Sequence, residues 1–226
     1  TMRFYENPQK TFENRETQRA YYIPEGKAEY TLLNGEWSFA YFPNSDIATE
    51  PEKWDKIEVP SCWQILGYEE PNYTNINYPF GCDDPYVPTI NPMGLYERKF
   101  TVADTSNKTY IVFEGIATCG VLYINGKYVG FTQGTHLQSE FDISKYVVEG
   151  ENTVRVKVYK WCAGSYLEDQ DCFRFNGIFR DVYLLSRPKG HIKDFDIKTE
   201  DNKRIIVNAD KNATVTLYDG DTVIGK

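Results

Sequence analysis

The sequence predicts an all-β protein built as a β-sandwich or jelly roll. Apolar and polar residues alternate with a period of two along much of the chain, which is the period of half-buried strands. Aromatic residues make up 15% of the 226 residues, with 18 Tyr and 13 Phe, and this favours strands over helices. Helical periodicity is scarce, and many strands with few helices indicate a sandwich or a jelly roll.

Each expected strand has its own signal. Val154, Val156 and Val158 share one face of "NTVRVKVYKW", as in an antiparallel strand with one buried side. Asn125-Gly126 separates two apolar runs and predicts a β-hairpin. In chain order, we expect strands at Trp37–Phe42, Leu95–Val102, Thr109–Ile116, within Val121–Phe131 as the hairpin, within Asn152–Trp161 and at Gly177–Leu185.

Two segments have sequence patterns that are not typical of strands. Ser139–Asn152 is expected to be a short connection that closes over the core through Phe141 and Ile143. Pro60–Pro92 is rich in Pro, Asn, Tyr and Gly, and so long a loop inside a compact domain is usually functional or a linker. Its many aromatic residues argue against a linker, so we expect the loop to pack against the rest of the protein.

A domain boundary is expected near Ser186–Gly190. Beyond it, residues 191–226 give about four short alternating strands, which is too few for an independent β-sandwich of roughly seven strands. The chain is therefore expected to stop partway through a second domain, with Lys226 not the natural C-terminus.

Composition excludes several classes of function. The formal net charge is −8 without any basic stripe, which argues against nucleic acid as a partner. No apolar run approaches the roughly 20 residues of a membrane-spanning helix, and no secretory signal is present, so we expect no membrane partner and a cytoplasmic protein. The 5 scattered Cys are expected to be reduced, and the 2 His are too few and too isolated for a metal site.

A series of phrases, in this order, resembles one family. They are "LNGEWSFAYFP", "VPSCWQILGY", "YTNINYPF", "VPTINPMGLYERKF", "YINGKYVGFTQGTHLQSEFDIS", "GSYLEDQDCFRFNGIFRDVYLL" and "IKDF". The series looks like the amino-terminal part of a LacZ-type β-galactosidase of glycoside hydrolase family 2, and it covers nearly the whole chain.

The resemblance implies a domain organisation. Residues 1–30 would be an N-terminal arm that reaches a neighbouring subunit, residues 31–188 a galactose-binding-like jelly roll called the sugar-binding domain, and residues 189–226 part of an immunoglobulin-like domain. The family's catalytic (β/α)₈ barrel comes later in the chain and alone takes roughly 250 residues. We therefore expect a non-catalytic, inactive fragment of an enzyme that hydrolyses terminal β-D-galactosides with retention.

The acidic stretch "SYLEDQDCFRF" leaves two interpretations open. Carboxylates set among aromatic residues form either a solvated turn or a contact to a hydroxyl-rich ligand or a cation. For Glu168 and Asp169 we favour salt bridges or turn hydrogen bonds. Asp171 matches the family aspartate that contacts galactose hydroxyls and helps to hold sodium.

Two further residues match the family's sugar site. Asn75 matches the asparagine that contacts the sugar, although asparagine in such a loop is more often a turn residue. Ile76 matches an apolar residue that lines the same pocket. The resemblance also implies sodium and magnesium for the full enzyme, contact with its own catalytic barrel and a homo-oligomer; the residues themselves indicate no cofactor for the fragment.

The sequence leaves three possible functions for the chain. The chain is part of a β-galactosidase, a free-standing carbohydrate-binding module, or a purely structural interface domain. A fourth reading makes the chain a hydrolase through Asp169 and Asp171, whose backbones would lie about 6–7 Å apart on a strand. We reject it, because glycosidase carboxylates normally come from facing elements, and one of them has its pKa raised by an apolar pocket.

Overall fold

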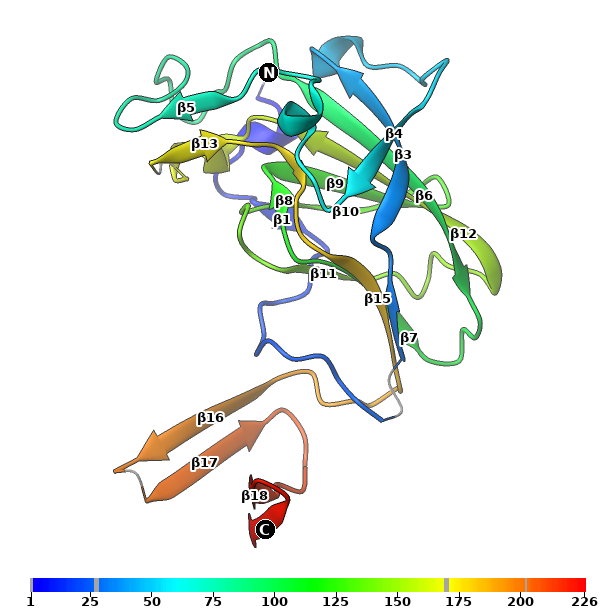
Figure 1. The fold of residues 1–226 in the computed structure, drawn as a ribbon, viewed down its shortest axis with the longest axis vertical. Helices are drawn as coiled ribbons and strands as arrows, with labels where there is room; N and C mark the ends of the chain where they lie inside the picture. Colours follow the sequence, from blue (N-terminus) through cyan, green and yellow to red (C-terminus); the bar gives the residue numbers. More distant parts are fainter. Residues whose placement is uncertain (1, 27–28, 169–170, 202) are drawn as a thin grey trace.

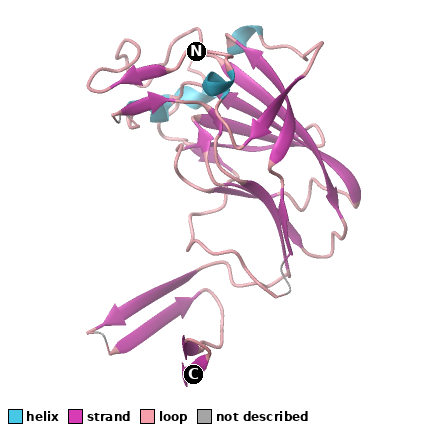
Figure 2. Cartoon of the chain, viewed as in Figure 1, coloured by secondary structure: helices cyan, strands magenta, loops and turns pink. Residues whose placement is uncertain are grey.

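The computed structural model describes residues 2–26, 29–168, 171–201 and 203–226 (Figure 1). Strands and loops make up nearly all of this part of the chain, and helical structure is confined to four short 3-10 turns (Figure 2). The all-β sandwich expected from the sequence is confirmed.

The elements follow one another along the described residues as listed here: η1 (Phe4–Glu6), β1 (Phe12–Glu13), β2 (Glu29–Leu32), β3 (Gly35–Phe42), η2 (Ser45–Ile47), β4 (Asp55–Val59), η3 (Trp63–Leu66), β5 (Asn72–Thr74), β6 (Met93–Val102), β7 (Lys108–Phe113), β8 (Ile116–Ala117), β9 (Cys119–Ile124), β10 (Lys127–Gln133), β11 (Ser139–Asp142), β12 (Gly150–Tyr159), η4 (Ala163–Tyr166), β13 (Cys172–Arg174), β14 (Gly177–Ile178), β15 (Val182–Arg187), β16 (Phe195–Glu200), β17 (Arg204–Ala209), β18 (Leu217–Asp219) and β19 (Thr222–Gly225).

Two antiparallel sheets form the sandwich. The larger sheet has the strand order β1-β10-β9-β12-β6-β3-β4, and the smaller has the order β11-β7-β15-β2. Four further two-stranded ladders join β5 with β13, β8 with β14, β16 with β17, and β18 with β19. The first of these, β5 with β13, carries the candidate site.

The core lies between the two sheets. Val154, Val156 and Val158 face it with at most 1% of their surface exposed, as the alternation predicts. They meet Tyr96 and Phe113, which are equally buried, in one apolar cluster. Each such side chain contributes about 1.5–3 kcal/mol by leaving water, so this cluster fixes which face of every strand points inward.

The hairpin predicted at Asn125-Gly126 is confirmed. Asn125 and Gly126 have φ values of 50° and 74° between β9 and β10. Both central residues at positive φ are typical of a type I′ turn, whose twist matches that of the flanking strands.

Two expected strands are each interrupted. The strand expected at Thr109–Ile116 is divided into β7 and β8, and the strand expected at Gly177–Leu185 is divided into β14 and β15. The breaks coincide, because β7 pairs with β15 while β8 pairs with β14. Gly115 sits at the break, where a Cβ would lie 2.8 Å from the Phe179 ring, so the chain passes there without room for a side chain.

The expectation of a connection at Ser139–Asn152 was wrong at both ends, because Gly150–Asn152 already belong to β12. Ser139–Asp142 forms β11, an edge strand that pairs with β7, with Phe141 opposite Ile111. Phe141 and Ile143 are fully buried, as expected, and their spacing of two is itself the strand signal.

The Pro60–Pro92 loop packs against the sandwich, as predicted. Trp63 is fully buried, and the Phe80 ring lies 5.0 Å from that of Trp161 and 5.4 Å from that of Tyr166. The loop also contains β5, which pairs with β13 and projects beside it at one end of the sandwich (Figure 1).

Residues 2–26 lie along the same sandwich. β1 pairs with β10 at the edge of the larger sheet, and the buried Tyr5 packs against Tyr159 with 4.9 Å between ring centroids. The four strands expected after the boundary are present as two hairpins, β16–β17 and β18–β19, which lie apart from the sandwich (Figure 1). No described helix is long and apolar enough to cross a membrane.

Candidate functional site

The candidate site is the two-stranded ribbon of β5 and β13. Asn72 pairs with Arg174, Tyr73 with Phe173, and Thr74 with Cys172. Because the strands are antiparallel, the next positions along the same register are Asn75 and Asp171. The pairing therefore brings together, at the tip of the ribbon, two of the residues that the sequence singled out, although 96 positions separate them in the chain.

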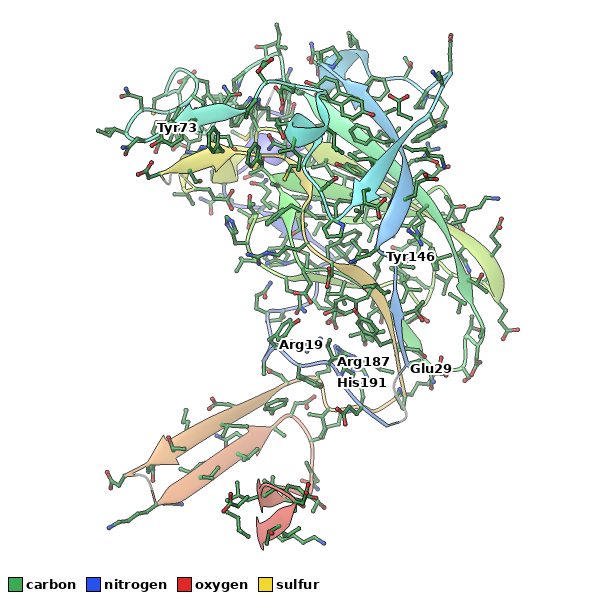
Figure 3. The ribbon with its side chains drawn as sticks, viewed as in Figure 1. Arg19, Glu29, Tyr73, Tyr146, Arg187 and His191 are labelled. Atoms are coloured by element: carbon green, nitrogen blue, oxygen red, sulfur yellow. The ribbon has the colours of Figure 1, made fainter. Side chains whose placement is uncertain are left out.

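The tip is open to solvent. Asn75, Ile76 and Asp171 are all exposed, and Ile76 has 83% of its surface accessible. The Tyr73 hydroxyl donates a hydrogen bond to Oδ1 of Asp171 across the ribbon. This bond stabilises the neutral phenol beside a carboxylate, and it raises the pKa of Tyr73 above its ordinary value of 10.0. Figure 3 shows Tyr73 on β5, facing β13.

The base of the ribbon is held by a buried polar network. The Lys160 ammonium lies 2.5 Å from Oε1 of Glu69 and 3.1 Å from Oδ1 of Asn72, the first residue of β5. Glu69 Oε2 accepts hydrogen bonds from the Trp63 indole at 3.0 Å and from Gln64 Nε2 at 2.9 Å. Glu69 thus receives three donors, which is what a largely buried carboxylate requires.

The network continues to the far end of β13. Gln64 donates to Asn176 Oδ1 at 2.8 Å and accepts from the Asn176 backbone N–H at 2.8 Å. Asn176 Nδ2 in turn donates to the Lys160 carbonyl at 3.4 Å. Both chain segments that lead into the ribbon are therefore tied to the same buried groups.

Glu168 has a structural position. Its Oε1 accepts from the Thr135 backbone N–H at 2.6 Å, and its Oε2 accepts from the Thr135 hydroxyl at 2.6 Å. The Arg174 guanidinium donates to the Glu168 carbonyl. Glu168 thus has a structural role, as expected, but through a long-range contact to Thr135 and not through a turn hydrogen bond. Asp169 and Gln170 lie outside the described residues.

A cleft of about 230 Å³ opens beside the ribbon. Aromatic side chains form one part of its wall, and Phe173 stacks on Phe175 with ring centroids 5.4 Å apart. Burial in this region raises the pKa of the Cys62 thiol to about 11, so the thiol stays protonated at neutral pH. The cleft is lined by Cys62, Ala117, Thr118, Thr135, His136, Trp161, Ser165, Glu168, Cys172, Phe173, Arg174, Phe175, Asn176 and Phe179.

The tip supplies hydrogen-bonding groups of both kinds. Asp171 offers carboxylate oxygens, and Asn75 offers an amide that both donates and accepts. Carboxylate oxygen is a suitable ligand for a hard cation, and Asp171 is exposed to solvent at the tip. Within the described residues, no group of three or more His, Cys, Asp or Glu is placed to hold a metal ion.

Sequence reasoning missed the residues that support the tip. Tyr73 is 53% exposed, and its hydroxyl donates a hydrogen bond to Asp171. The sequence does carry a signal for Lys160, which continues the inward-facing series Val154, Val156, Val158. Its exposed fraction is 3%. A lysine at a core-facing position indicates a buried partner.

Comparison with known proteins identifies the family. The family described as "Glycosyl hydrolases family 2, sugar binding domain" matches residues 30–188, which is more than half of the chain. The chain belongs to glycoside hydrolase family 2. The resemblance inferred from the sequence phrases is thereby confirmed.

Curated relatives in glycoside hydrolase family 2 are β-galactosidases. The chain is 43% identical to the β-galactosidase of Actinobacillus pleuropneumoniae over 217 residues, covering 87% of this chain and 21% of that protein. It is 45% identical to the β-galactosidase of Kluyveromyces lactis over 209 residues, covering 85% of this chain and 20% of that protein. The chain therefore spans about a fifth of the length of these relatives.

Solved structures of two β-glucuronidases share the fold. The β-glucuronidase of an uncultured Clostridium sp. superposes with a TM-score of 0.66 at 22% identity, covering 86% of this chain and 36% of that one. A Ruminococcus gnavus β-glucuronidase gives a TM-score of 0.62 at 20% identity, covering 85% and 35%. At this identity the likeness supports the sandwich fold alone.

Proposed function

We propose that this chain is the sugar-binding part of a cytoplasmic β-galactosidase that hydrolyses terminal β-D-galactosides with retention. In this proposal the chain carries no catalytic residue and has no hydrolytic activity by itself. It completes the substrate pocket of a catalytic barrel on a longer polypeptide, and it takes part in contacts within a homo-oligomer. The identity of 43% and 45% to two β-galactosidases supports the choice of galactoside.

The observation that carries the proposal is the register of β5 with β13. Its last pair, Thr74 with Cys172, makes Asn75 and Asp171 the next residues on the two strands, and both are exposed at the tip of the ribbon. A sugar hydroxyl can donate to the Asp171 carboxylate, and a charge-assisted hydrogen bond of this kind contributes about 1.5–3 kcal/mol. The same pair of groups would penalise an epimer whose hydroxyl points elsewhere.

The exposure of the tip favours a shared pocket over a free-standing binding module. A binding site buries about 70–90% of a small ligand's surface. The tip offers only one wall, since Ile76 is 83% exposed and Asn75 and Asp171 are exposed beside it. Other walls from the barrel would cover Ile76 and enclose the sugar.

Sodium belongs to the same proposal through Asp171. Its Oδ1 accepts from Tyr73, and the carboxylate has a second oxygen for a cation. A sodium ion there would orient a galactose hydroxyl, and its remaining ligands would come from the rest of the enzyme. Magnesium has no cluster of acidic residues or histidine among the described residues, so we assign it no residue of this chain.

The decisive experiment is Asp171→Asn in the full-length enzyme. We expect the KM for a galactoside to rise roughly tenfold and its sodium dependence to weaken, because the amide keeps the shape of the carboxylate but loses the charge. Steady-state kinetics over a series of sodium concentrations measures both effects. Asp196→Asn, at an exposed aspartate on β16, is the control and should change neither.

Two results would contradict the proposal. Asp171→Asn kinetics that match the wild type at every sodium concentration would remove Asp171 from the pocket. Saturable binding of galactose to the isolated 226-residue chain in a calorimeter would support the binding module instead.

A further inference from the structure

We propose that Lys160 and Glu69 are positioning residues: their buried ion pair fixes the ribbon of β5 and β13 in the orientation that presents Asn75 and Asp171. The inference rests on the proposed function for the role of the tip. Its structural part, the holding of the ribbon by Lys160, stands on contacts that are independent of any ligand.

The ion pair lies at the base of the ribbon. The side chains of Lys160 and Glu69 are 4% and 18% exposed, and 2.5 Å separates the ammonium from the carboxylate. The ammonium also lies 4.9 Å from the centre of the Trp161 ring, which adds a cation–π contact. Such burial shields the pair from salt and holds it in one geometry.

One strand of the ribbon is bonded directly to this pair. Asn72 begins β5, and its Oδ1 accepts a hydrogen bond from Lys160 at 3.1 Å. Three positions later the chain reaches Asn75. The direction in which β5 leaves the body of the protein is therefore set by the ammonium of Lys160.

The other strand is held at the same level. Arg174 pairs with Asn72 in the register, and its guanidinium donates to the Glu168 carbonyl. The Glu168 carboxylate is itself bound twice by Thr135, in the turn that follows β10, at 2.6 Å in both bonds. The two strands are thus anchored at paired residues, and Asp171 lies three positions before the second anchor, Arg174.

An ion pair does something here that an apolar contact does not. Apolar packing has no preferred direction, whereas Lys160 must satisfy Glu69 and Asn72 at once. Burying these charges costs desolvation energy that a valine, as at Val158 before it, would not incur. The charge at a core-facing position thus provides orientation of the ribbon, and it does so at the expense of some stability.

The structural part is tested on the 226-residue chain by amide hydrogen exchange. Lys160→Met keeps the length of the side chain and removes the charge. We expect exchange at residues 72–75 and 171–174 to speed up at least tenfold, while amides in the centre of β12 and β6 stay protected. Lys99→Met is the matched control, because Lys99 pairs with Glu151 at 2.8 Å with both side chains at least 65% exposed.

Two more variants separate positioning from a general loss of stability. Asn72→Ala removes the bond to the ribbon and leaves the Lys160–Glu69 pair intact, so it should loosen the same amides without unfolding the core. Lys160→Arg keeps the positive charge, and we expect it to restore exchange to within about threefold of the wild type.

The functional part is read in the full-length enzyme. We expect Lys160→Met and Asn72→Ala to raise KM for a galactoside roughly tenfold and to lower kcat less, because the groups that bind the sugar are displaced while the catalytic residues are not. Lys160→Arg should recover most of the KM, and Lys99→Met should leave it unchanged.

The outcomes distinguish this inference from the proposed function. Unchanged exchange in the ribbon of Lys160→Met and Asn72→Ala would overturn the inference. So would an unchanged KM in both variants when Asp171→Asn raises it. If Asp171→Asn itself has no effect on KM, the proposed function fails, while faster exchange confined to the ribbon would still establish Lys160 as its anchor.

Discussion

At the scale of single residues, Glu168 and Asp171 show how position decides the role of a carboxylate. Glu168 is bound at both oxygens by Thr135, in the turn that follows β10. Asp171, three positions later, is exposed and contacts Tyr73 from the facing strand. One carboxylate is thus consumed by the fold, and the other remains available to a ligand.

The contact between Tyr73 and Asp171 can be measured directly. The carboxylate raises the pKa of the phenol, and the contact should be lost as pH rises through that raised value, because phenolate and carboxylate repel. We expect Asp171→Asn to lower the pKa of Tyr73 towards 10.0. An NMR titration of the labelled tyrosine ring carbon follows this shift, and a pKa that stays the same in the variant would show that the two side chains do not meet.

The sequence predicts Asp171 and Asn75 only in part. Family resemblance selects them, but period-two reasoning carries no information that β5 pairs with β13, because the pairing joins a proline-rich loop to a distant strand. Nor does it reveal Asn72 or Glu69 as partners of Lys160, since contacts between residues about 90 positions apart depend on how the loop folds back. Of these three residues, only Lys160 could be singled out from the sequence, because it continues the inward-facing series.

At the scale of elements, the sequence predicted a structure best where a short local segment determines it. The hairpin at Asn125-Gly126 was predicted because positive φ at two successive residues restricts the sequence strongly. The breaks after β7 and β14 were not, because they arise where two strands part from their sheet together and Phe179 covers Gly115. Such a break is a property of the pair, and Gly115 is its local mark, since an isolated glycine inside a strand pattern indicates an irregularity.

The hairpin gives a clean test of backbone strain. Gly126 has a φ of 74° and no atom within 4 Å of the position of a Cβ. We expect Gly126→Ala to lower the free energy of unfolding by about 1 kcal/mol through the backbone alone. Urea denaturation measures the change. Gly81→Ala is the matched control, since Gly81 is equally open but is not in the left-handed region, and a loss as large in that variant would refute the explanation.

At the scale of the whole molecule, the N-terminal segment joins the sandwich to the strands beyond it. The Tyr22 hydroxyl donates to the Ile192 carbonyl at 2.7 Å, and the Ala20 backbone N–H donates to Asp194 at 2.8 Å. Arg19 and Arg187 both pair with the buried Glu140, at 2.6 and 3.2 Å. Figure 3 shows Arg19, Arg187 and His191 together at this junction.

This segment should protect the connection between the two parts from proteolysis. We expect Tyr22→Phe to speed tryptic cleavage after Lys189 or Lys193 about fivefold, because it removes one hydrogen bond worth about 1 kcal/mol and keeps the ring. The rate is read from gel bands under native conditions. Tyr218→Phe, at a tyrosine that is 59% exposed on β18, is the control, and equal rates in the two variants would mean that the segment does not restrain the connection.

The length of the ribbon determines how strongly a change in its orientation displaces its exposed end. From Asn72 to Asn75 the backbone extends about 10 Å. A tilt of about 10° at the anchored end would therefore carry the free end through about 1.7 Å, several times the roughly 0.5 Å that a functional constellation tolerates. A small change of angle at the anchored end thus becomes a large displacement at the end that would contact the sugar. Directional bonds of Asn72 and Arg174 hold the anchored end in place. The interior of the protein thus determines how accurately the exposed end is positioned.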